Sequence, residues 1–155
     1  MKNKHQSGIV EKLNSLLSTY QVAYFNTRAS HWMIRGENFF ELHKVFEVAY
    51  NDATEKIDEI AERILTLGGV PLMTATDMIK NSQINEVKPD GGQEVCIKGM
   101  LNDLTRLTEM ENEIIKMAGD ADDYVTADIL TKYLGEQQKT SWMLYQFLNK
   151  KSTIK

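Results

Sequence analysis

The sequence has only one cysteine, Cys96, among its 155 residues, and it contains two prolines and nine glycines. A single cysteine excludes an internal disulfide and is typical of a protein from the reducing cytoplasm. No apolar run approaches the roughly 18 residues that a membrane-spanning helix needs. The first eight residues, MKNKHQSG, also lack the apolar segment of a secretion signal. We therefore expect a cytoplasmic protein without a membrane segment, in which few prolines and glycines interrupt the helices.

The sequence does contain four long segments in which apolar residues recur at helical spacing. They span about Ile9 to Met33, Asn38 to Gly68, about Gln93 to Ala118, and Asp122 or Asp123 to Leu148. We expect Asn38 and Glu41 to form a capping box at the start of the second helix. The pair Gly68-Gly69, with Pro71 beyond it, should end that helix. We also expect Trp142, in the fourth segment, to lie in the core.

The connections between these segments differ in length, and this difference indicates the topology. Short loops join the first segment to the second and the third to the fourth, so each pair should be antiparallel neighbours. The middle connection, residues 70–92, is long enough to run the length of a bundle and leaves room for a short helix from Thr76 to Lys80. One long crossover predicts an all-α, ferritin-like four-helix bundle. We expect residues 1–155 to form one such domain, with tails at residues 1–7 and 149–155.

Candidate metal ligands lie along one flank of the apolar stripe of the second helix. At about 100° per residue, four side chains fall within about a quarter-turn of one another: His43, Glu47, Asp58 and Glu62. Imidazole and carboxylate groups suit iron, manganese or zinc. However, His43 and Asp58 are roughly 22 Å apart along the helix axis, because each residue adds about 1.5 Å. One chain therefore cannot bring them to the same ion.

Two copies of this helix, packed antiparallel about a two-fold axis, would remove the difficulty. The midpoint of positions 43 and 62 and that of positions 47 and 58 coincide near residues 52 and 53. One register therefore sets His43 and Glu47 of one subunit against Asp58 and Glu62 of the other, and His31 can approach the same place across a tight reversal. This predicts two symmetric metal sites, each shared between two subunits. The alternative is that the acidic side chains are solvated and the histidines pack in the core.

The usual ferritin-like di-iron site within one bundle needs a Glu-x-x-His motif on each of two helices. This chain has no such motif, and its third histidine, His5, lies near the N-terminus. The sequence therefore excludes a ferritin site within one chain.

The run from His31 to Pro71 reads H-W-x-x-x-G-x-x-F-x-x-L-H-x-x-F-E, followed by D-x-x-A-E-R-I-x-x-L-G-G-x-P. This signature, together with the later KTSWML, closely resembles the Dps family of mini-ferritins. The resemblance implies a homo-oligomeric hollow shell, a dodecamer, that oxidises ferrous iron at its two-fold interfaces and stores the ferric mineral. It implies that one subunit supplies His31, His43 and Glu47 as metal ligands and that its neighbour supplies Asp58 and Glu62. Hydrogen peroxide would be the preferred oxidant.

The resemblance also suggests roles for residues outside this ligand set. Trp32 would lie beside the iron site, either as a sacrificial electron donor or as a residue packed in the interface. Asp123 and Asp128 would line a three-fold pore through which cations pass, although acids at a helix start also cap it and oppose its dipole.

Two rival interpretations stay open from the sequence. A non-catalytic DNA-compacting shell would use the terminal lysines, but these are few against a net charge of -4, and an acidic body repels phosphate. A plain helical interaction module would leave the acidic flank of the second helix solvated. Our preferred interpretation is a ferroxidase and iron-storage protein that protects the cell from peroxide.

Overall fold

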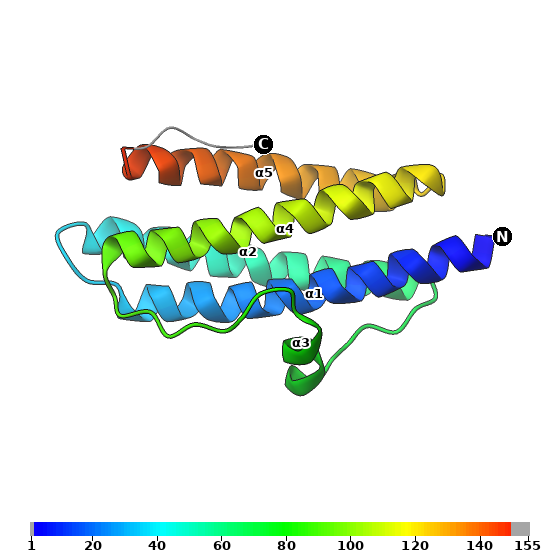
Figure 1. Cartoon of the computed structure of the whole chain (residues 1–155), viewed down its shortest axis with the longest axis horizontal. Coiled ribbons are helices and arrows are strands. Elements are labelled where there is room, and N and C mark those ends of the chain that lie inside the picture. The colour runs from blue at the N-terminus through cyan, green and yellow to red at the C-terminus, as the bar shows by residue number, and fades with distance from the viewer. Residues whose placement is uncertain (1, 150–155) are drawn as a thin grey trace.

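The computed structural model describes residues 2–149, and it describes side chains for residues 6–149. Its helices over this range are α1 (Lys2–Met33), α2 (Phe39–Thr66), α3 (Ala75–Asn81), α4 (Gln93–Asp120) and α5 (Tyr124–Phe147). The four long helices lie side by side as a bundle. The short α3 lies outside this bundle and packs on α1 (Figure 1). The predicted all-α four-helix bundle is confirmed. Within the described residues, no helix is both long enough and apolar enough to cross a membrane.

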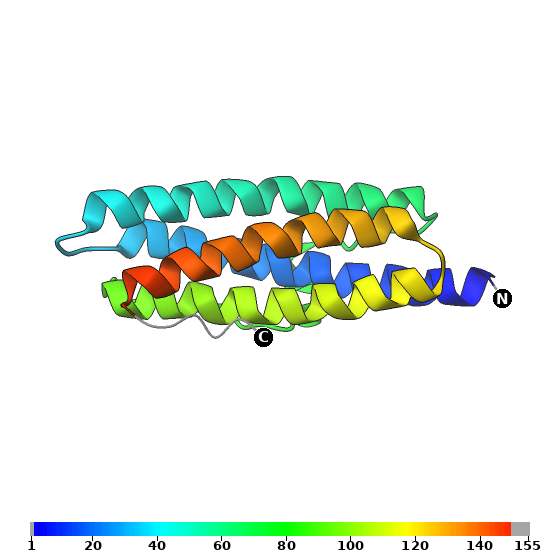
Figure 2. The ribbon, with the colours of Figure 1, turned by 90° about the horizontal axis from the view of Figure 1, so that it is seen from above.

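The order of the helices requires one long crossover. α1 and α2 run antiparallel, as do α4 and α5, whereas α2 and α4 run in the same direction (Figures 1 and 2). The chain between α2 and α4 therefore returns along the whole bundle, and it does so over the outer side of α1 (Figure 1). Two asparagines of α1 hold it there. The side chain of Asn14 accepts a hydrogen bond from the backbone N–H of Leu72 (2.8 Å), and that of Asn26 accepts one from Val87 (2.9 Å).

One expected boundary, the start of the first helix, differs clearly from the structure. α1 begins at Lys2 rather than near Ile9, so it includes most of the segment that we expected to be an N-terminal tail. The short helix of the crossover forms close to its expected place, and the side chain of Thr74 accepts a hydrogen bond from Asp77 at its start. Residues 150–155 of the predicted C-terminal tail lie outside the described residues.

The two ends of α2 test two sequence predictions. Asn38 occupies the N-cap position, but its side chain makes no capping hydrogen bond, so the capping-box prediction is wrong. Its backbone (φ -99°, ψ 25°) is not in the extended conformation that usually aims a capping side chain at the free amides. At the other end, Gly68 has a φ of 77°, and the N–H of Gly69 donates to the carbonyl of Ile64. The predicted glycine stop is therefore confirmed.

The core consists of two groups of buried apolar residues, one toward each end of the bundle. The larger group joins α1 to the other three long helices through residues such as Leu13, Leu17 and Ile114. The smaller one surrounds Phe46 near the α1–α2 turn and includes Cys96. Trp142 is 49% exposed on α5, so our expectation that it lies in the core is wrong.

Candidate metal centre

His31 and His43 lie on either side of the reversal that joins α1 to α2. Gly36 has a φ of 122°, which residues with a Cβ rarely adopt, and a Cβ there would come within 2.7 Å of the Gln93 side chain. The backbone N–H of Arg35 donates to the carbonyl of Gly91, which ties the reversal to the end of the crossover (3.1 Å). These contacts turn α2 back against α1 and bring the two histidines together.

Each of the two imidazoles forms a hydrogen bond with the backbone carbonyl of the other histidine. Nδ1 of His31 lies 2.7 Å from the carbonyl oxygen of His43, and Nδ1 of His43 lies 2.9 Å from the carbonyl oxygen of His31. A carbonyl oxygen only accepts hydrogen bonds, so both Nδ1 atoms must carry the proton. In a neutral imidazole, Nε2 then carries a free lone pair. The geometry therefore selects, in both histidines, the tautomer that can bind a metal through Nε2.

Packing fixes the orientation of the rings as well. The imidazole rings stack with their centroids 3.7 Å apart and an angle of 19° between their planes. The ring of Phe39 stacks on the outer side of His43 at 4.9 Å, and the ring of Tyr50 meets His31 edge-on at 5.2 Å. His31 is buried and His43 is half-buried. The pair is thus rigid before any ion binds.

The acidic candidates lie farther along α2. Glu47 is one turn beyond His43, is partly exposed, and forms an ion pair with Lys44 (3.2 Å). Asp58 and Glu62 are exposed near the other end of this continuous helix. Within the described part of the chain, no group of three or more histidine, cysteine and acidic side chains could hold a metal ion. One chain thus presents two separated groups of candidate ligands on α2.

Two exposed apolar side chains lie on the same face of α2 as these candidates. Phe40 is 83% exposed and Leu65 is 57% exposed. At about 100° per residue, both fall within the quarter-turn that the candidate ligands define. Their midpoint also coincides with the one near residues 52 and 53. The antiparallel register that joins the two ligand groups would therefore set Phe40 of one subunit against Leu65 of the other. The sequence analysis missed this pair, although its spacing was visible.

The two pore candidates have different surroundings. Asp123 caps α5 by accepting from the backbone N–H of Thr126, and its Oδ1 accepts from Nη2 of Arg63 (2.7 Å). Within the chain, Arg63 thus compensates the charge of Asp123, and the carboxylate oxygens of Asp123 already accept hydrogen bonds. Asp128 is exposed one turn farther along α5. The pore role stays a prediction for both residues, and the surroundings of Asp128 suit it better.

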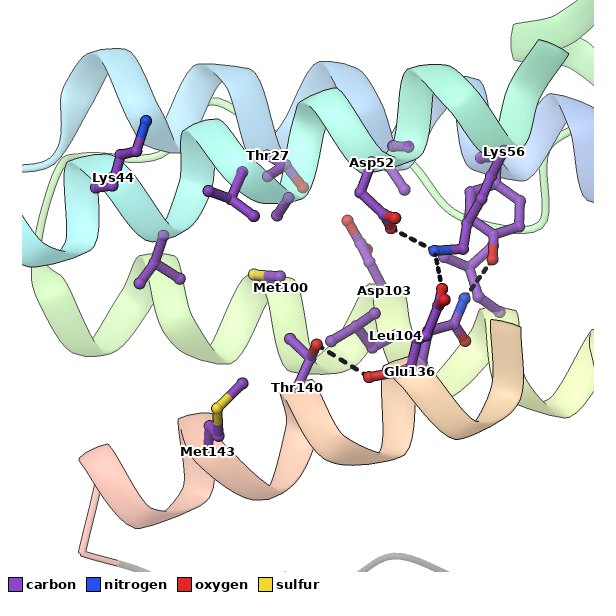
Figure 3. A pocket seen from close by; sticks show the side chains of 18 residues that line it. Thr27, Lys44, Asp52, Lys56, Met100, Asp103, Leu104, Glu136, Thr140 and Met143 are labelled. Atoms are coloured by element: carbon purple, nitrogen blue, oxygen red, sulfur yellow. Dashed lines mark hydrogen bonds and ion pairs between the residues drawn. The ribbon is translucent and has the colours of Figure 1, made fainter. Parts of the chain in front are cut away.

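A cavity of about 400 Å³ has no histidine in its lining; residues of all four long helices line it, among them the apolar side chains of Met100, Leu104 and Met143. At one end, the ammonium of Lys56 lies between Asp52 (2.5 Å) and Glu136 (2.8 Å), as Figure 3 shows. Burial tends to lower the pKa of Lys56, but the hydrogen bonds to its two carboxylate partners outweigh this effect and raise it. Lys56 therefore stays charged and compensates these acids within the chain.

Sequence reasoning missed a buried polar group in the centre of the bundle, formed by Tyr20, Glu111 and Gln137. Glu111 follows Leu107 by one turn and precedes Ile114, so it occupies a position of the apolar stripe of α4. A charged residue at a position of the apolar stripe was the feature of the sequence that could have indicated this buried polar group. Burial raises the pKa of Glu111 to about 7, although hydrogen bonds from Tyr20 and Gln137 oppose this rise.

The fold and the histidine–carboxylate pattern define the ferritin-like class, and comparison with known proteins agrees. The family model for the ferritin-like domain matches residues 10–154. The chain is 42% identical to an uncharacterised protein of Haemophilus influenzae, over 87% of this chain and 84% of that protein. It is 37% identical to the DNA protection during starvation protein of Porphyromonas gingivalis, over 97% of this chain and 94% of that protein.

Solved structures give the same result. The Dps protein of Vibrio cholerae O1, described as a ferritin-like diiron-carboxylate protein, superposes with a TM-score of 0.91 and 38% identity, covering 94% of this chain and 91% of that one. A Dps protein from Bacillus brevis superposes with a TM-score of 0.92 and 32% identity, covering 96% and 99%. The chain therefore belongs to the Dps family of ferritin-like proteins. These relatives support an iron-binding homo-oligomer of the iron-storage ferroxidase type, and they do not favour a purely DNA-compacting shell.

Proposed function

We propose that this protein oxidises ferrous iron with hydrogen peroxide at sites shared between two subunits of a dodecameric shell, and that it stores the ferric product inside. His31, His43 and Glu47 of one subunit and Asp58 and Glu62 of its neighbour bind the iron. The observation that carries this proposal is the reciprocal hydrogen bonding of the two histidines, which leaves both Nε2 lone pairs free. The spacing of the acids on α2 supports a site that only a second copy completes.

The chemistry of these side chains suits iron oxidation. Neutral imidazoles bind ferrous iron, and anionic carboxylates stabilise the ferric state more than the ferrous state because of its higher charge. A set of only a few protein ligands leaves room for the oxidant and water. Two ferrous ions each give one electron to peroxide, whose O–O bond breaks, and two protons complete two water molecules. No hydroxyl radical is then released.

Subunit mixing tests whether the site is shared. One variant carries His31→Ala with His43→Ala, and the other carries Asp58→Asn with Glu62→Gln. Each homogeneous shell is expected to lack peroxide-dependent ferric absorbance after anaerobic ferrous loading. Random co-assembly makes half of the two-fold pairs mixed, and each mixed pair has one intact site of its two. About one quarter of the wild-type ferric absorbance should therefore return.

The control mixes each variant with itself through the same dissociation and reassembly steps. No ferric absorbance should return in those samples. In every sample, light scattering should give a particle of about twelve chains of 17.7 kDa. Full activity of either homogeneous variant would contradict the assigned ligands. Absence of any recovery in a mixed shell of the correct mass would contradict sharing between subunits.

A further inference from the structure

Tyr20 lies in the centre of the bundle and donates its hydroxyl proton in a hydrogen bond to Oε1 of Glu111 (2.5 Å). Both side chains are buried. The amide Nε2 of Gln137 donates to the Tyr20 hydroxyl oxygen and to the same Oε1 of Glu111, at 3.0 Å from the latter. A phenol and a carboxylate are therefore held in direct contact, away from water.

The second oxygen of Glu111 is available to take up a proton. Oε2 is buried and has no hydrogen-bond partner among the described residues. Burial raises the pKa of Glu111 to about 7, so near neutral pH the group passes readily between its ionised and neutral forms. In the ionised form it is a proton acceptor for Tyr20.

Aromatic rings in contact lead from the metal centre to Tyr24, which lies one helical turn from Tyr20 on α1. The ring centroids of His31 and Tyr50 are 5.2 Å apart, and those of Tyr50 and Tyr24 are 6.0 Å apart. Tyr24 and Tyr20 lie one turn apart on α1, which sets their Cβ atoms about 6 Å apart. Each step is short compared with the distances over which electrons pass between aromatic side chains.

The surroundings of Tyr24 and Tyr20 decide which of these two residues loses an electron more easily. Oxidation of a phenol near neutral pH requires that its proton leave with the electron. The hydroxyl of Tyr24 accepts from Arg28 (3.0 Å), and the Arg28 guanidinium lies 4.9 Å from its ring centroid. This positive charge opposes removal of an electron from Tyr24. Tyr20 instead faces a carboxylate, which favours oxidation coupled to proton loss.

We propose that Tyr20 is a redox-active tyrosine that supplies an electron to the shared iron site when peroxide arrives at a site holding only one ferrous ion. This inference rests on the proposed function. The ferrous ion gives one electron and Tyr20 gives the second, by way of Tyr24 and Tyr50. The O–O bond of peroxide breaks and, with two protons from solvent, yields two water molecules. The Tyr20 O–H bond also breaks, and its proton moves to Glu111, which leaves a neutral phenoxyl radical.

Freeze-quench electron paramagnetic resonance of the assembled shell tests this inference. The shell is loaded anaerobically with one ferrous ion per site and mixed with peroxide, while ferric absorbance is recorded in parallel. A tyrosyl radical signal is expected, and its hyperfine splitting should collapse in protein that contains ring-deuterated tyrosine. In Tyr20→Phe the signal should be lost and spin-trapped hydroxyl radical should increase, while ferric formation with two ferrous ions per site persists.

Tyr124→Phe is the matched control, because the exposed Tyr124 hydroxyl also donates to a carboxylate, Asp122 (3.0 Å). This variant should keep the full radical signal. Glu111→Gln is a second variant that removes the proton acceptor while Tyr20 stays, and it should also lose the signal. Thermal unfolding confirms that each variant is folded.

The outcomes separate this inference from the proposed function. Ferric absorbance without any tyrosyl signal in the wild type, or an unchanged signal in Tyr20→Phe, overturns the role of Tyr20 and leaves the ferroxidase proposal standing. A signal that persists in Glu111→Gln overturns the proton transfer to Glu111. Absence of ferric absorbance in the wild type overturns the proposed function and this inference together.

Discussion

At the scale of single residues, two carboxyl groups that the fold shields from water have unusual proton affinities. Burial raises the pKa of Glu111 to about 7 and that of Asp103 to about 6, although the hydrogen bond from Asn26 opposes the rise for Asp103. Both groups lie on α4. The folded protein thus binds protons in a pH range where these carboxyl groups would be ionised in the unfolded chain.

The pKa of Glu111 leads to a prediction about stability. Its folded pKa of about 7 exceeds the ordinary 4.5, so the folded state binds more protons between these values. The free energy of unfolding should therefore fall as the pH rises through this range, by up to about 3 kcal/mol from this group. Glu111→Gln removes the titration, so its unfolding temperature should rise relative to wild type between pH 5 and pH 7.5 in iron-free protein.

The matched control for this prediction is Glu113→Gln on the same helix. Glu113 is exposed and forms an ion pair with Lys12 (2.6 Å). Its variant should show a small difference from wild type that stays nearly constant over the same pH range. A Glu111→Gln difference that is equally constant would contradict the raised pKa.

At the scale of the helix, α2 carries the candidate ligands and also two exposed apolar residues that could align it with a second copy of α2. The two apolar residues Phe40 and Leu65 bracket the ligand positions on one face, and both are exposed in the single chain. Exposed large apolar residues on a functional face commonly mark a contact with another molecule. A second α2 helix in the antiparallel register would bury both pairs at once.

A charge exchange tests this register. Phe40→Asp alone and Leu65→Lys alone should each weaken the two-fold contact, because each sets a charge against an apolar partner. The double variant should regain part of the assembly and of the ferric absorbance, since the introduced carboxylate of one subunit would then face the introduced ammonium of the other across the axis. Light scattering and ferrous oxidation measure both effects.

Met73→Lys is a control for the added charge, because Met73 is exposed on the crossover and lies off the α2 face. It should assemble and oxidise iron as the wild type does. A double variant no better than either single one would contradict the antiparallel register.

The helices also show what the sequence can and cannot predict. Apolar periodicity and the glycine pair at residues 68–69 predicted the extent of α2, because these signals are local. The start of α1 was misjudged, since the residues from Lys2 to Gly8 extend the helix by about two turns without any apolar signal. The reciprocal bonding of His31 and His43 was beyond prediction, because it depends on how the reversal at Gly36 places two backbone carbonyls.

At the scale of the whole molecule, the chain is one unit of a larger particle. The bundle is complete on its own, but within the described residues one chain holds no complete metal site. Dps structures similar to this chain support assembly into a homo-oligomer. If the metal site is shared as we propose, activity depends on assembly, and in the proposed shell the route by which iron enters is a property of the particle.

Asp128 supplies the test of that route. If Asp128 side chains converge at a three-fold pore, Asp128→Asn should slow ferric formation at low ferrous concentration, because fewer negative charges attract the cation. At high ferrous concentration the rate should approach that of wild type. Stopped-flow absorbance measures both, with Glu86→Gln on the crossover as a variant of equal charge change. Equal rates at low ferrous concentration would contradict a role for Asp128 in uptake.

The long crossover has a consequence for how the chain folds. Each pair, α1 with α2 and α4 with α5, is a helical hairpin whose contacts are local in sequence, and such contacts form fast. The crossover joins the two hairpins, and the entropy of closing a loop grows only slowly with its length. The docking of one preformed hairpin onto the other is therefore expected to limit the folding rate. Asn14 and Asn26, which fasten the crossover to α1, would act after that step and slow unfolding rather than speed folding.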